Sequence, residues 1–227
     1  MAEVVVVPAR NEAPRIGAVL DRITATLPGR PVIVVDGAST DATARVARAH
    51  GALVVPQDGR GYPAALRTGL GWAAARGAQR LLLLDADGQH PPEEAPRLLS
   101  ALDLADAVVG SRDGTGTPGP FGRRAGNAAL AALVRLLTGI PLGDVTSGYW
   151  AFRGAAIPRV AEAMPTDVAD ANLRVLVARL GLRLAEVPVR MDARVDGASM
   201  HDGLAGVRNF GRSVRATLRE ALRAPPP

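Results

Sequence analysis

Residues 81–91 read LLLLDADGQHP, an unbroken apolar run that stops at two aspartates and ends in a proline. Such a run without polar alternation is typical of a strand that is buried on both faces, as in a parallel sheet. Parallel strands bring their carboxyl ends to one edge, where open α/β sheets bind their ligands. The pattern therefore predicts an α/β fold with a ligand site that begins at Asp85.

The rest of the chain alternates similar apolar runs with helical patterns, starting with the four valines of residues 4–7. Strands are expected at residues 3–9, 31–36, 52–55, 81–84, 107–110, 149–152 and 184–189. Helices are expected at residues 14–27, 39–51, 62–76, 92–102, 121–137, 169–180 and 204–222, with Ser39 and then Asp41 capping the second. This order predicts a mostly parallel, Rossmann-like central sheet flanked by helices.

The composition is that of a single globular domain. A chain of 227 residues with 48% hydrophobic content can bury one substantial core. The absence of cysteine excludes disulfides, thiolate nucleophiles and cysteine-ligated metal sites. The start lacks the features of a signal peptide, and no apolar run reaches the roughly 18 residues of a membrane span. We therefore expect a cytoplasmic protein, soluble or peripheral at the inner face of the membrane.

The net charge of +5 does not predict a nucleic-acid partner, because the arginines are spread along the chain without interleaved aromatic residues. Residues 1–203 are expected to form the domain, and residues 204–227 a basic amphipathic helix with a disordered proline tail. This helix is expected to pack on the core, or alternatively to lie on a membrane, through Leu204, Val207, Phe210, Val214, Leu218 and Leu222. No pattern points to a particular oligomeric state.

Asp85 and Asp87, one residue apart after a buried strand, have no packing role there and would repel each other. A divalent cation removes this repulsion, and oxygen ligands from Asp85, Asp87 and Gln89 suit Mg²⁺ or Mn²⁺, which also bind a diphosphate. The alternative is a turn in which the aspartates cap the helix after Pro91. His90 is interpreted as structural rather than as a ligand.

Polar residues also follow the first two predicted strands, at the same expected edge of the sheet. Residues 8–12 read PARNE, and residues 36–41 read DGASTD. Helix capping by Asn11 or Ser39 explains part of each pattern. Capping does not explain Asp36, and both segments are also suited to meeting a nucleotide.

Seven segments together resemble glycosyltransferase family 2 with the GT-A fold, and in particular dolichol-phosphate mannose synthases and other polyprenyl-phosphate sugar transferases. The likeness runs from Val4 to about Ser199. It rests on VVPARNEA, VIVVDGASTDAT, GRGYPAALRTG, DADGQHPPEE, VVGSR, DVTSGYWAFR and AEVPVRMDARVDGAS. The metal segment and the order of the motifs are specific, whereas any one opening motif is not.

The resemblance implies an inverting transfer of a hexose from a nucleotide sugar, of the GDP-mannose or UDP-glucose type, to polyprenyl or dolichyl phosphate. The residues implied to contact the nucleotide sugar are Pro8, Ala9, Glu12, Asp36, Asp85 and Ala86. Arg112 and Arg194 are implied to face phosphates, because guanidinium groups match phosphate oxygens. The alternative for both is an ordinary surface arginine.

The chain departs from the family pattern at several positions. Gly37 stands where the family usually has a second aspartate that contacts the base, which leaves the donor open between GDP and UDP. Arg10 replaces a frequent aromatic residue, Asn172 a glutamate and Met200 a lysine, for which His201 could substitute. Many relatives carry C-terminal transmembrane helices where this chain has its basic helix.

The acceptor decides whether catalysis needs a base. A polyprenyl phosphate is already anionic and needs alignment and charge screening, whereas a hydroxyl acceptor needs a carboxylate, Asp144 or Asp170. Asp144 can also be read as a turn residue. The expected catalytic residues are therefore Asp87, Arg112, Asp144 and Arg194.

Other functions are weighed against this one. A transferase acting on a soluble hydroxyl acceptor, or a non-catalytic nucleotide-sugar-binding protein, would fit many of the same residues. A nucleotidyltransferase or a dehydrogenase fits less well, because the PARNEA loop after the first strand lacks their glycine-rich phosphate-binding pattern.

Overall fold

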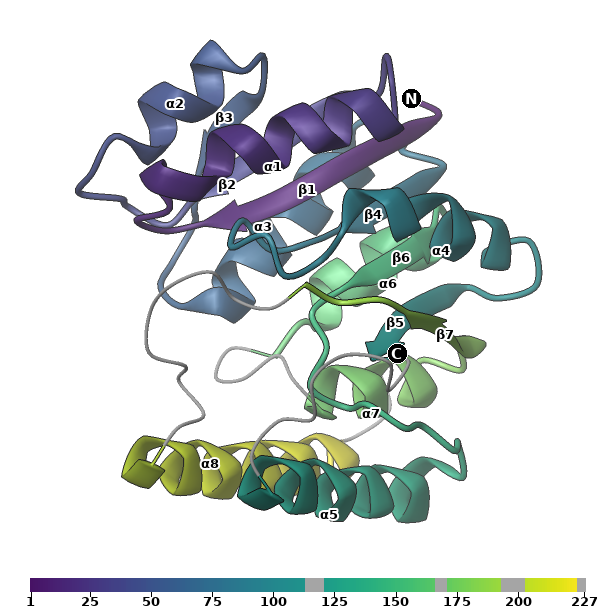
Figure 1. The fold of residues 1–227 in the computed structure, drawn as a ribbon. Coiled ribbons are helices and arrows are strands. Elements are labelled where there is room, and N and C mark those ends of the chain that lie inside the picture. The colour runs from purple at the N-terminus through teal and green to yellow at the C-terminus, as the bar shows by residue number, and fades with distance from the viewer. Residues whose placement is uncertain (113–120, 166–170, 193–202, 224–227) are drawn as a thin grey trace.

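The computed structural model describes residues 1–112, 121–165, 171–192 and 203–223, which form a seven-stranded sheet with helices around it (Figure 1). The strands are β1 (Glu3–Ala9), β2 (Val32–Asp36), β3 (Leu53–Pro56), β4 (Arg80–Leu83), β5 (Ala107–Arg112), β6 (Trp150–Arg153) and β7 (Leu184–Val189). Their order is β3-β2-β1-β4-β6-β5-β7. β6 runs antiparallel to β4 and β5, and the other neighbouring pairs are parallel, which confirms the predicted fold class.

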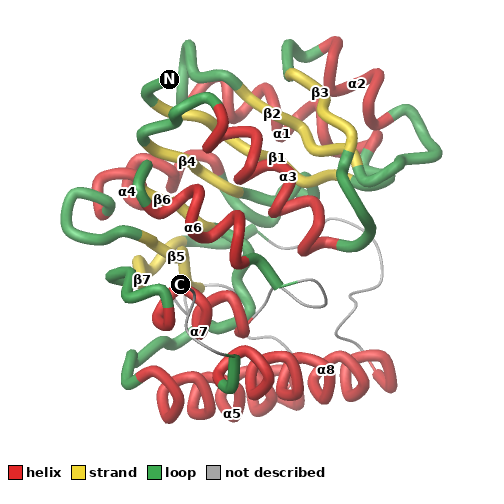
Figure 2. Tube along the Cα trace, turned by 180° about the vertical axis from the view of Figure 1, so that it is seen from behind, coloured by secondary structure: helices red, strands yellow, loops and turns green. Residues whose placement is uncertain are grey.

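Helices cover both faces of the sheet, as Figures 1 and 2 show from opposite sides. They are α1 (Ala13–Thr26), α2 (Thr43–Ala49), α3 (Tyr62–Ala75), the 3-10 turn η1 (Pro92–Glu94), α4 (Ala95–Ala101), α5 (Phe121–Thr138), α6 (Ala156–Ala163), α7 (Ala171–Arg179) and α8 (Gly203–Ala221). Val5 and Val7 of β1 pack in a cluster with α1, α2 and α4, whereas Val4 and Val6 pack in a second cluster with α3, α6 and α7. Because both faces are buried, β1 shows no polar alternation.

The predicted element boundaries agree with the structure to within a few residues, with three differences. α6 was not predicted, because its short sequence contains Pro158, which the first turn of a helix tolerates. β5 continues to Arg112. The predicted cap at Ser39 is wrong, since α2 begins at Thr43 and has no side-chain cap at Ala42. Residues 169–170 and 224–227, predicted as a helix start and a proline tail, lie outside the described residues.

The terminal helix α8 lies beside α5 at the end of the molecule beyond β5 and β7 (Figures 1 and 2). Packing on the domain is confirmed, but the apolar stripe is not its centre, since Phe210 and Leu218 are 39% and 41% exposed. The buried side chains of α8 are Ser213, Ala216, Thr217 and Glu220. Glu220 pairs with Arg179 of α7, so an ion pair and hydroxyl groups form this seam. The division at residue 203 stays a prediction.

Candidate active site

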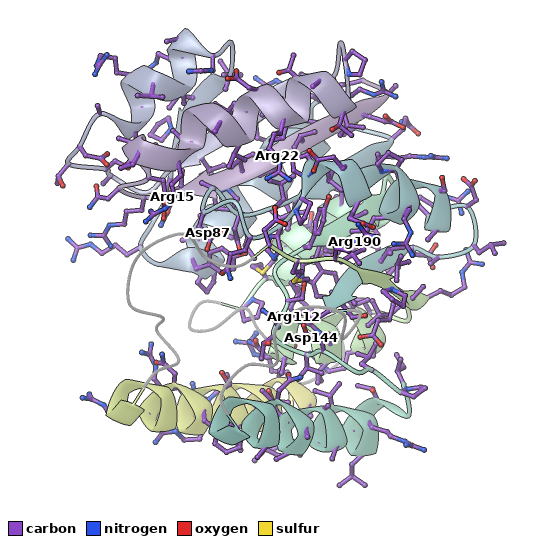
Figure 3. The ribbon with its side chains drawn as sticks, in the orientation of Figure 1. Arg15, Arg22, Asp87, Arg112, Asp144 and Arg190 are labelled. Carbon is purple, nitrogen blue, oxygen red and sulfur yellow. The ribbon has the colours of Figure 1, made fainter. Side chains whose placement is uncertain are left out.

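The carboxyl ends of β1, β2 and β4 bring three predicted site segments to one edge of the sheet. Ala9 of β1 is in register with Asp36 of β2. On the other side of β1, Leu84 donates its N–H to Val6 and so carries the chain into Asp85 at the same edge. This is where an open α/β sheet binds its ligands. Figure 3 shows Asp87 at this edge.

Asp85 is oriented by two side chains. Its Oδ1 accepts a hydrogen bond from the Tyr62 hydroxyl at 2.9 Å, and its N–H donates to Nδ1 of His90 at 3.1 Å. His90 is buried and stacks on Tyr149, whose hydroxyl donates to the carbonyl of Pro91. Burial raises the pKa of the Tyr149 phenol, so this group stays a donor. The structural interpretation of His90 is therefore confirmed, because its Nδ1 is an acceptor for the backbone.

Gly148 explains how closely the next loop approaches Asp85. A Cβ at this position would lie 2.9 Å from Oδ2 of Asp85 and 2.8 Å from the hydroxyl oxygen of Tyr62. A side chain here would therefore displace one of these two groups. The glycine lies in the DVTSGY motif, but its spacing role was not predicted.

The Asp87 turn meets the requirements of a metal-binding loop in its chemistry. Oδ1 of Asp87 accepts the N–H of Gln89 at 3.0 Å, and Gly88 between them has φ +81°. Neither aspartate caps a helix, since η1 and α4 have no side-chain cap, so the capping alternative is wrong. Ala86 is 2% exposed and anchors the loop in the core, which leaves its backbone as the part that can meet a ligand.

The donor set fits a divalent ion that also binds the substrate. Among the residues that the structure describes, no group of three or more His, Cys, Asp or Glu side chains could hold a metal ion. Two carboxylates and an amide oxygen are hard ligands, and Mg²⁺ and Mn²⁺ commonly complete such a set with substrate phosphates and water. The predicted ligands Asp85, Asp87 and Gln89 are thus brought together within one turn.

Arg112, at the end of β5, is paired with Asp144, as Figure 3 shows. Nη1 of Arg112 lies 2.7 Å from Oδ2 of Asp144, and Oδ1 accepts the N–H and hydroxyl of Thr146 at 3.0 and 2.9 Å. Burial acts to raise the pKa of Asp144, but the Arg112 charge and the Thr146 bonds outweigh it and lower this pKa. Asp144 is therefore a carboxylate that holds Arg112, whose side chain is 53% exposed.

The segment around Asp144 is held by polar side chains from three other elements. The Glu186 carboxylate of β7 accepts the N–H groups of Gly143 and Asp144, at 2.9 and 3.0 Å. Asn127 of α5 donates to the carbonyl of Gly143 and accepts the N–H of Val145. The fully buried Arg174 of α7 donates to the carbonyls of residues 144 and 147 and lies over the Trp150 ring.

The exits of β1 and β2 are cross-linked to each other rather than capped by their own residues. Thr43 accepts the N–H of Glu12 at 2.8 Å, and Asp41 accepts the N–H of Ala13 at 3.2 Å, so α2 supplies the caps of α1. The predicted N-cap role of Asn11 is wrong, because its Oδ1 accepts the N–H of Thr40 instead. Glu12 pairs with Arg15 at 2.8 Å.

Asp36 differs from its neighbours in this edge. Its Oδ2 accepts the N–H of Ser39 at 3.3 Å, but its Oδ1 is buried and has no hydrogen-bond partner among the described residues. Pro8 and Ala9 beside it are buried, so only their backbone can meet a ligand. A buried acceptor without a donor is unfavourable, which indicates a ligand group at this point.

Comparison with known proteins decides the family of this site. The sequence model described as glycosyl transferase family 2 matches residues 4–160. The chain belongs to glycosyltransferase family 2. It is 33% identical to an undecaprenyl-phosphate mannosyltransferase of Micrococcus luteus, over 99% of this chain and 98% of the relative. It is 34% identical to a dolichyl-phosphate hexose transferase of Haloferax volcanii, over 96% and 95% of the two chains.

Solved structures support the GT-A fold of this glycosyltransferase. A glucosyl-3-phosphoglycerate synthase of Mycobacterium tuberculosis, in complex with Mn²⁺, UDP and glucosyl-3-phosphoglycerate, superposes with a TM-score of 0.72. The two sequences are 25% identical, and the match covers 97% of this chain and 79% of the other. A third sequence relative, a polyprenol monophosphomannose synthase of Mycolicibacterium smegmatis, is 30% identical over 88% of this chain and 80% of its own.

The glycosyltransferase chain ties the end of β7 to the Asp87 loop. Asp192 donates its N–H to the carbonyl of Gln89 at 3.0 Å, and its carboxylate lies 3.2 Å from Arg22. Arg22 also pairs with Glu93 at 2.7 Å, which raises the pKa of Arg22 and lowers that of Glu93. The predicted residues Arg194, Asp170, Met200 and His201 lie outside the described residues.

Sequence reasoning missed five residues that support the glycosyltransferase site: Tyr62, Asn127, Gly148, Arg174 and Glu186. Tyr62, Gly148 and Glu186 stand inside the family motifs, so the motifs marked them without giving a role. Asn127 and Arg174 stand inside ordinary helical patterns, where no local signal separates a buried polar residue from a solvated one.

Proposed function

We propose that this glycosyltransferase transfers a hexose from a nucleotide sugar to a polyprenyl phosphate, with inversion and with a divalent metal held by Asp85 and Asp87. One observation carries the proposal: a carboxylate loop oriented by Tyr62 lies beside a loop that presents an ion-paired arginine, with Gly148 where the two meet. Such a site has hard ligands for a cation and a cation for a second phosphate.

The carboxylates bind and orient the donor diphosphate through the metal, with Gln89 as a further oxygen ligand. When bound, the ion would neutralise charge that develops on the departing nucleoside diphosphate. Tyr62 fixes one oxygen of Asp85 by a 2.9 Å hydrogen bond and so leaves the carboxylate one preferred orientation. Preorganised groups of this kind avoid reorganisation at the moment of reaction.

Arg112 is the residue proposed to face the acceptor phosphate. Its guanidinium is half exposed and is held by the buried Asp144, so the positive charge is fixed at the loop rather than spread by side-chain motion. An arginine in this position screens the repulsion between an anionic acceptor and an anionic donor. Arg194, proposed to contact phosphates as well, lies outside the described residues.

The acceptor class is inferred from the state of Asp144. In the proposed displacement an acceptor phosphate oxygen bonds to the anomeric carbon, and the bond from that carbon to the donor diphosphate oxygen breaks. No proton has to leave the acceptor. A hydroxyl acceptor would need a base, but both oxygens of Asp144 accept hydrogen bonds and its pKa is lowered, which makes it a weak base. This favours the phosphate acceptor, in line with the names of the sequence relatives.

A lipid acceptor would be met at a membrane surface, and α8 has a suitable face. Opposite its buried seam lie exposed arginines: Arg208, Arg212, Arg215, Arg219 and Arg223. A hollow of about 480 Å³ is lined by three of these and by Gly211. None of the described helices is long and apolar enough to cross a bilayer. Peripheral binding at the inner face through anionic lipids is therefore proposed.

The test is sugar transfer by the full chain, with Mn²⁺ or Mg²⁺, across GDP- and UDP-sugars, with polyprenyl phosphate, a soluble alcohol or no acceptor. Metal-dependent transfer to the polyprenyl phosphate, lost by at least about 100-fold in Asp87→Asn, supports the proposal. Asp103→Asn is the matched control, because Asp103 is 65% exposed and pairs with Arg80 away from the site. Transfer to the alcohol alone would contradict the acceptor class, and equal activity in Asp87→Asn would contradict the metal site.

A further inference from the structure

The backbone at Gly37 passes between two side chains from neighbouring loops. Gly37 follows Asp36 at the end of β2 and donates its N–H to the carbonyl of Ala9 at 2.8 Å. A Cβ at this position would lie 3.0 Å from Oε1 of Gln57 and 3.2 Å from Cβ of Arg10. Gln57 and Arg10 therefore occupy the volume that a side chain at residue 37 would need.

The amide of Gln57 is held in one orientation. Its Nε2 donates to the carbonyls of Gly59 and Gly61, at 3.1 and 3.0 Å, which uses both amide hydrogens. These two glycines have φ of +94° and +83°, a conformation that other residues rarely adopt. The Oε1 atom is consequently the acceptor that faces Gly37.

Asp36 adds a second acceptor beside this one. The N–H of Gln57 donates to the carbonyl of Asp36 at 3.0 Å, so the two residues are neighbours on adjacent strands. Oδ1 of Asp36 is buried and without a hydrogen-bond partner among the described residues. The end of β2 and β3 thus presents two acceptor oxygens, and one of them lacks a donor.

We propose that Oδ1 of Asp36 and Oε1 of Gln57 bind the nucleobase of the donor and select guanine. The Watson–Crick edge of guanine carries two adjacent donors, N1–H and the 2-amino group, which match two acceptors. Uracil has one N–H between two carbonyl oxygens, and those oxygens would face the same acceptors without a hydrogen. A site built for a missing hydrogen-bond group rejects the analogue strongly, because its polar atoms are left unpaired.

This inference rests on the proposed function, in that the site must bind a nucleotide sugar, and it names the nucleotide. Position supports it. The base would lie at the ends of β2 and β3, and the diphosphate would extend past β1 to the Asp85–Asp87 loop after β4, in the order of the sheet.

The experiment is calorimetric binding of GDP, UDP and inosine diphosphate to the full chain with Mn²⁺. The wild type is expected to bind GDP at least about tenfold more tightly than UDP. Inosine diphosphate, which lacks the 2-amino group, is expected to bind about tenfold more weakly than GDP, as for the loss of one hydrogen bond.

The variant Gln57→Ala is expected to weaken GDP binding by about tenfold and UDP binding by less than about threefold. Gln79→Ala is the matched control, because Gln79 is exposed at the opposite end of β4 and bonds only a local carbonyl among the interactions described. Circular dichroism verifies that both variants fold.

The outcomes separate the two proposals. UDP binding as tight as GDP binding, or a Gln57→Ala variant equal to the wild type for GDP, would overturn the guanine assignment while metal-dependent turnover of another nucleotide sugar kept the transferase function. If neither GDP nor UDP bound to the folded wild type, both proposals would fail together.

Discussion

Residues 85–89 and residues 143–147 form two loops of the same site, but different forces hold them. The first loop follows the buried strand β4 and is anchored by Ala86 in the core and by the stacked rings of His90 and Tyr149. The second is held by charged and amide side chains from α5, α7 and β7. A loop fixed by apolar burial tolerates small losses, whereas a buried polar network loses much when one member is removed.

Arg174→Met is expected to have the largest effect on stability, because it removes a fully buried cation and leaves the carbonyls of Asp144 and Ser147 without their donor. We expect a loss of about 3 kcal/mol in the free energy of unfolding, measured with urea. Arg215→Met, at an exposed position of α8, is the matched control and should change it by less than about 0.5 kcal/mol. A small change in Arg174→Met would show that the polar network is not what holds residues 143–147.

Gly148→Ala tests the point where the two loops meet. The new Cβ would lie within 2.9 Å of both Tyr62 and Asp85, so one of them must move. We expect a loss of about 2 kcal/mol in stability and a fall in kcat of about 100-fold, measured in the transfer assay. Gly71→Ala in α3 is the control, since its Cβ meets nothing within 4 Å and alanine favours a helix. Equal kcat in the two variants would contradict the positioning of Asp85 by this contact.

Asp144→Asn tests the ion pair that presents Arg112. We expect a loss of about 1–2 kcal/mol in stability near pH 7, because a charge-assisted hydrogen bond becomes a neutral one. The pKa of Asp144 is lowered on folding from its ordinary value of 3.8, so the pair contributes fully above that value and is lost as the pH falls through the lower folded value.

Urea unfolding at pH 7, 5 and 3 measures this dependence. The difference between wild type and Asp144→Asn should be the same at pH 7 and 5 and smaller at pH 3. A difference that instead grew on acidification would mean that Asp144 is protonated in the folded protein, and would restore it as a candidate base.

Tyr62→Phe is expected to have the smallest effect. It removes the hydroxyl that bonds Oδ1 of Asp85 but keeps the ring, so stability should change by about 1 kcal/mol or less. The KM for the metal–donor complex should rise about three- to tenfold with little change in fold. An unchanged KM would mean that the apolar anchors alone orient Asp85.

The same contrast explains how far the sequence predicted this protein. The strands of the first half were predicted to within a residue or two, because buried parallel strands read as valine and leucine runs. The carboxylate turn after β4 followed from that local pattern. Arg112 and Asp144 were named from motifs, but their pairing across 32 residues was not predicted. Asn127 and Arg174 act through contacts that no sequence period records.

Gly37 shows the other limit of sequence reasoning. The sequence shows a missing side chain at this position, but only the structure shows that Gln57 fills the space from another strand. The substitute comes from a residue 20 positions further along, whose amide is fixed by two glycine carbonyls. Compensation of this kind depends on tertiary packing, which local patterns do not contain.

The most direct test of the central claim is the titration of Mn²⁺ by electron paramagnetic resonance in the presence of GDP or UDP. We predict that the double variant Asp85→Asn, Asp87→Asn weakens nucleotide-dependent Mn²⁺ binding by at least about 100-fold. The matched double variant Asp21→Asn, Asp103→Asn, at carboxylates that are 67% and 65% exposed, should bind like the wild type. Wild-type Mn²⁺ affinity in the Asp85–Asp87 variant would contradict the metal site.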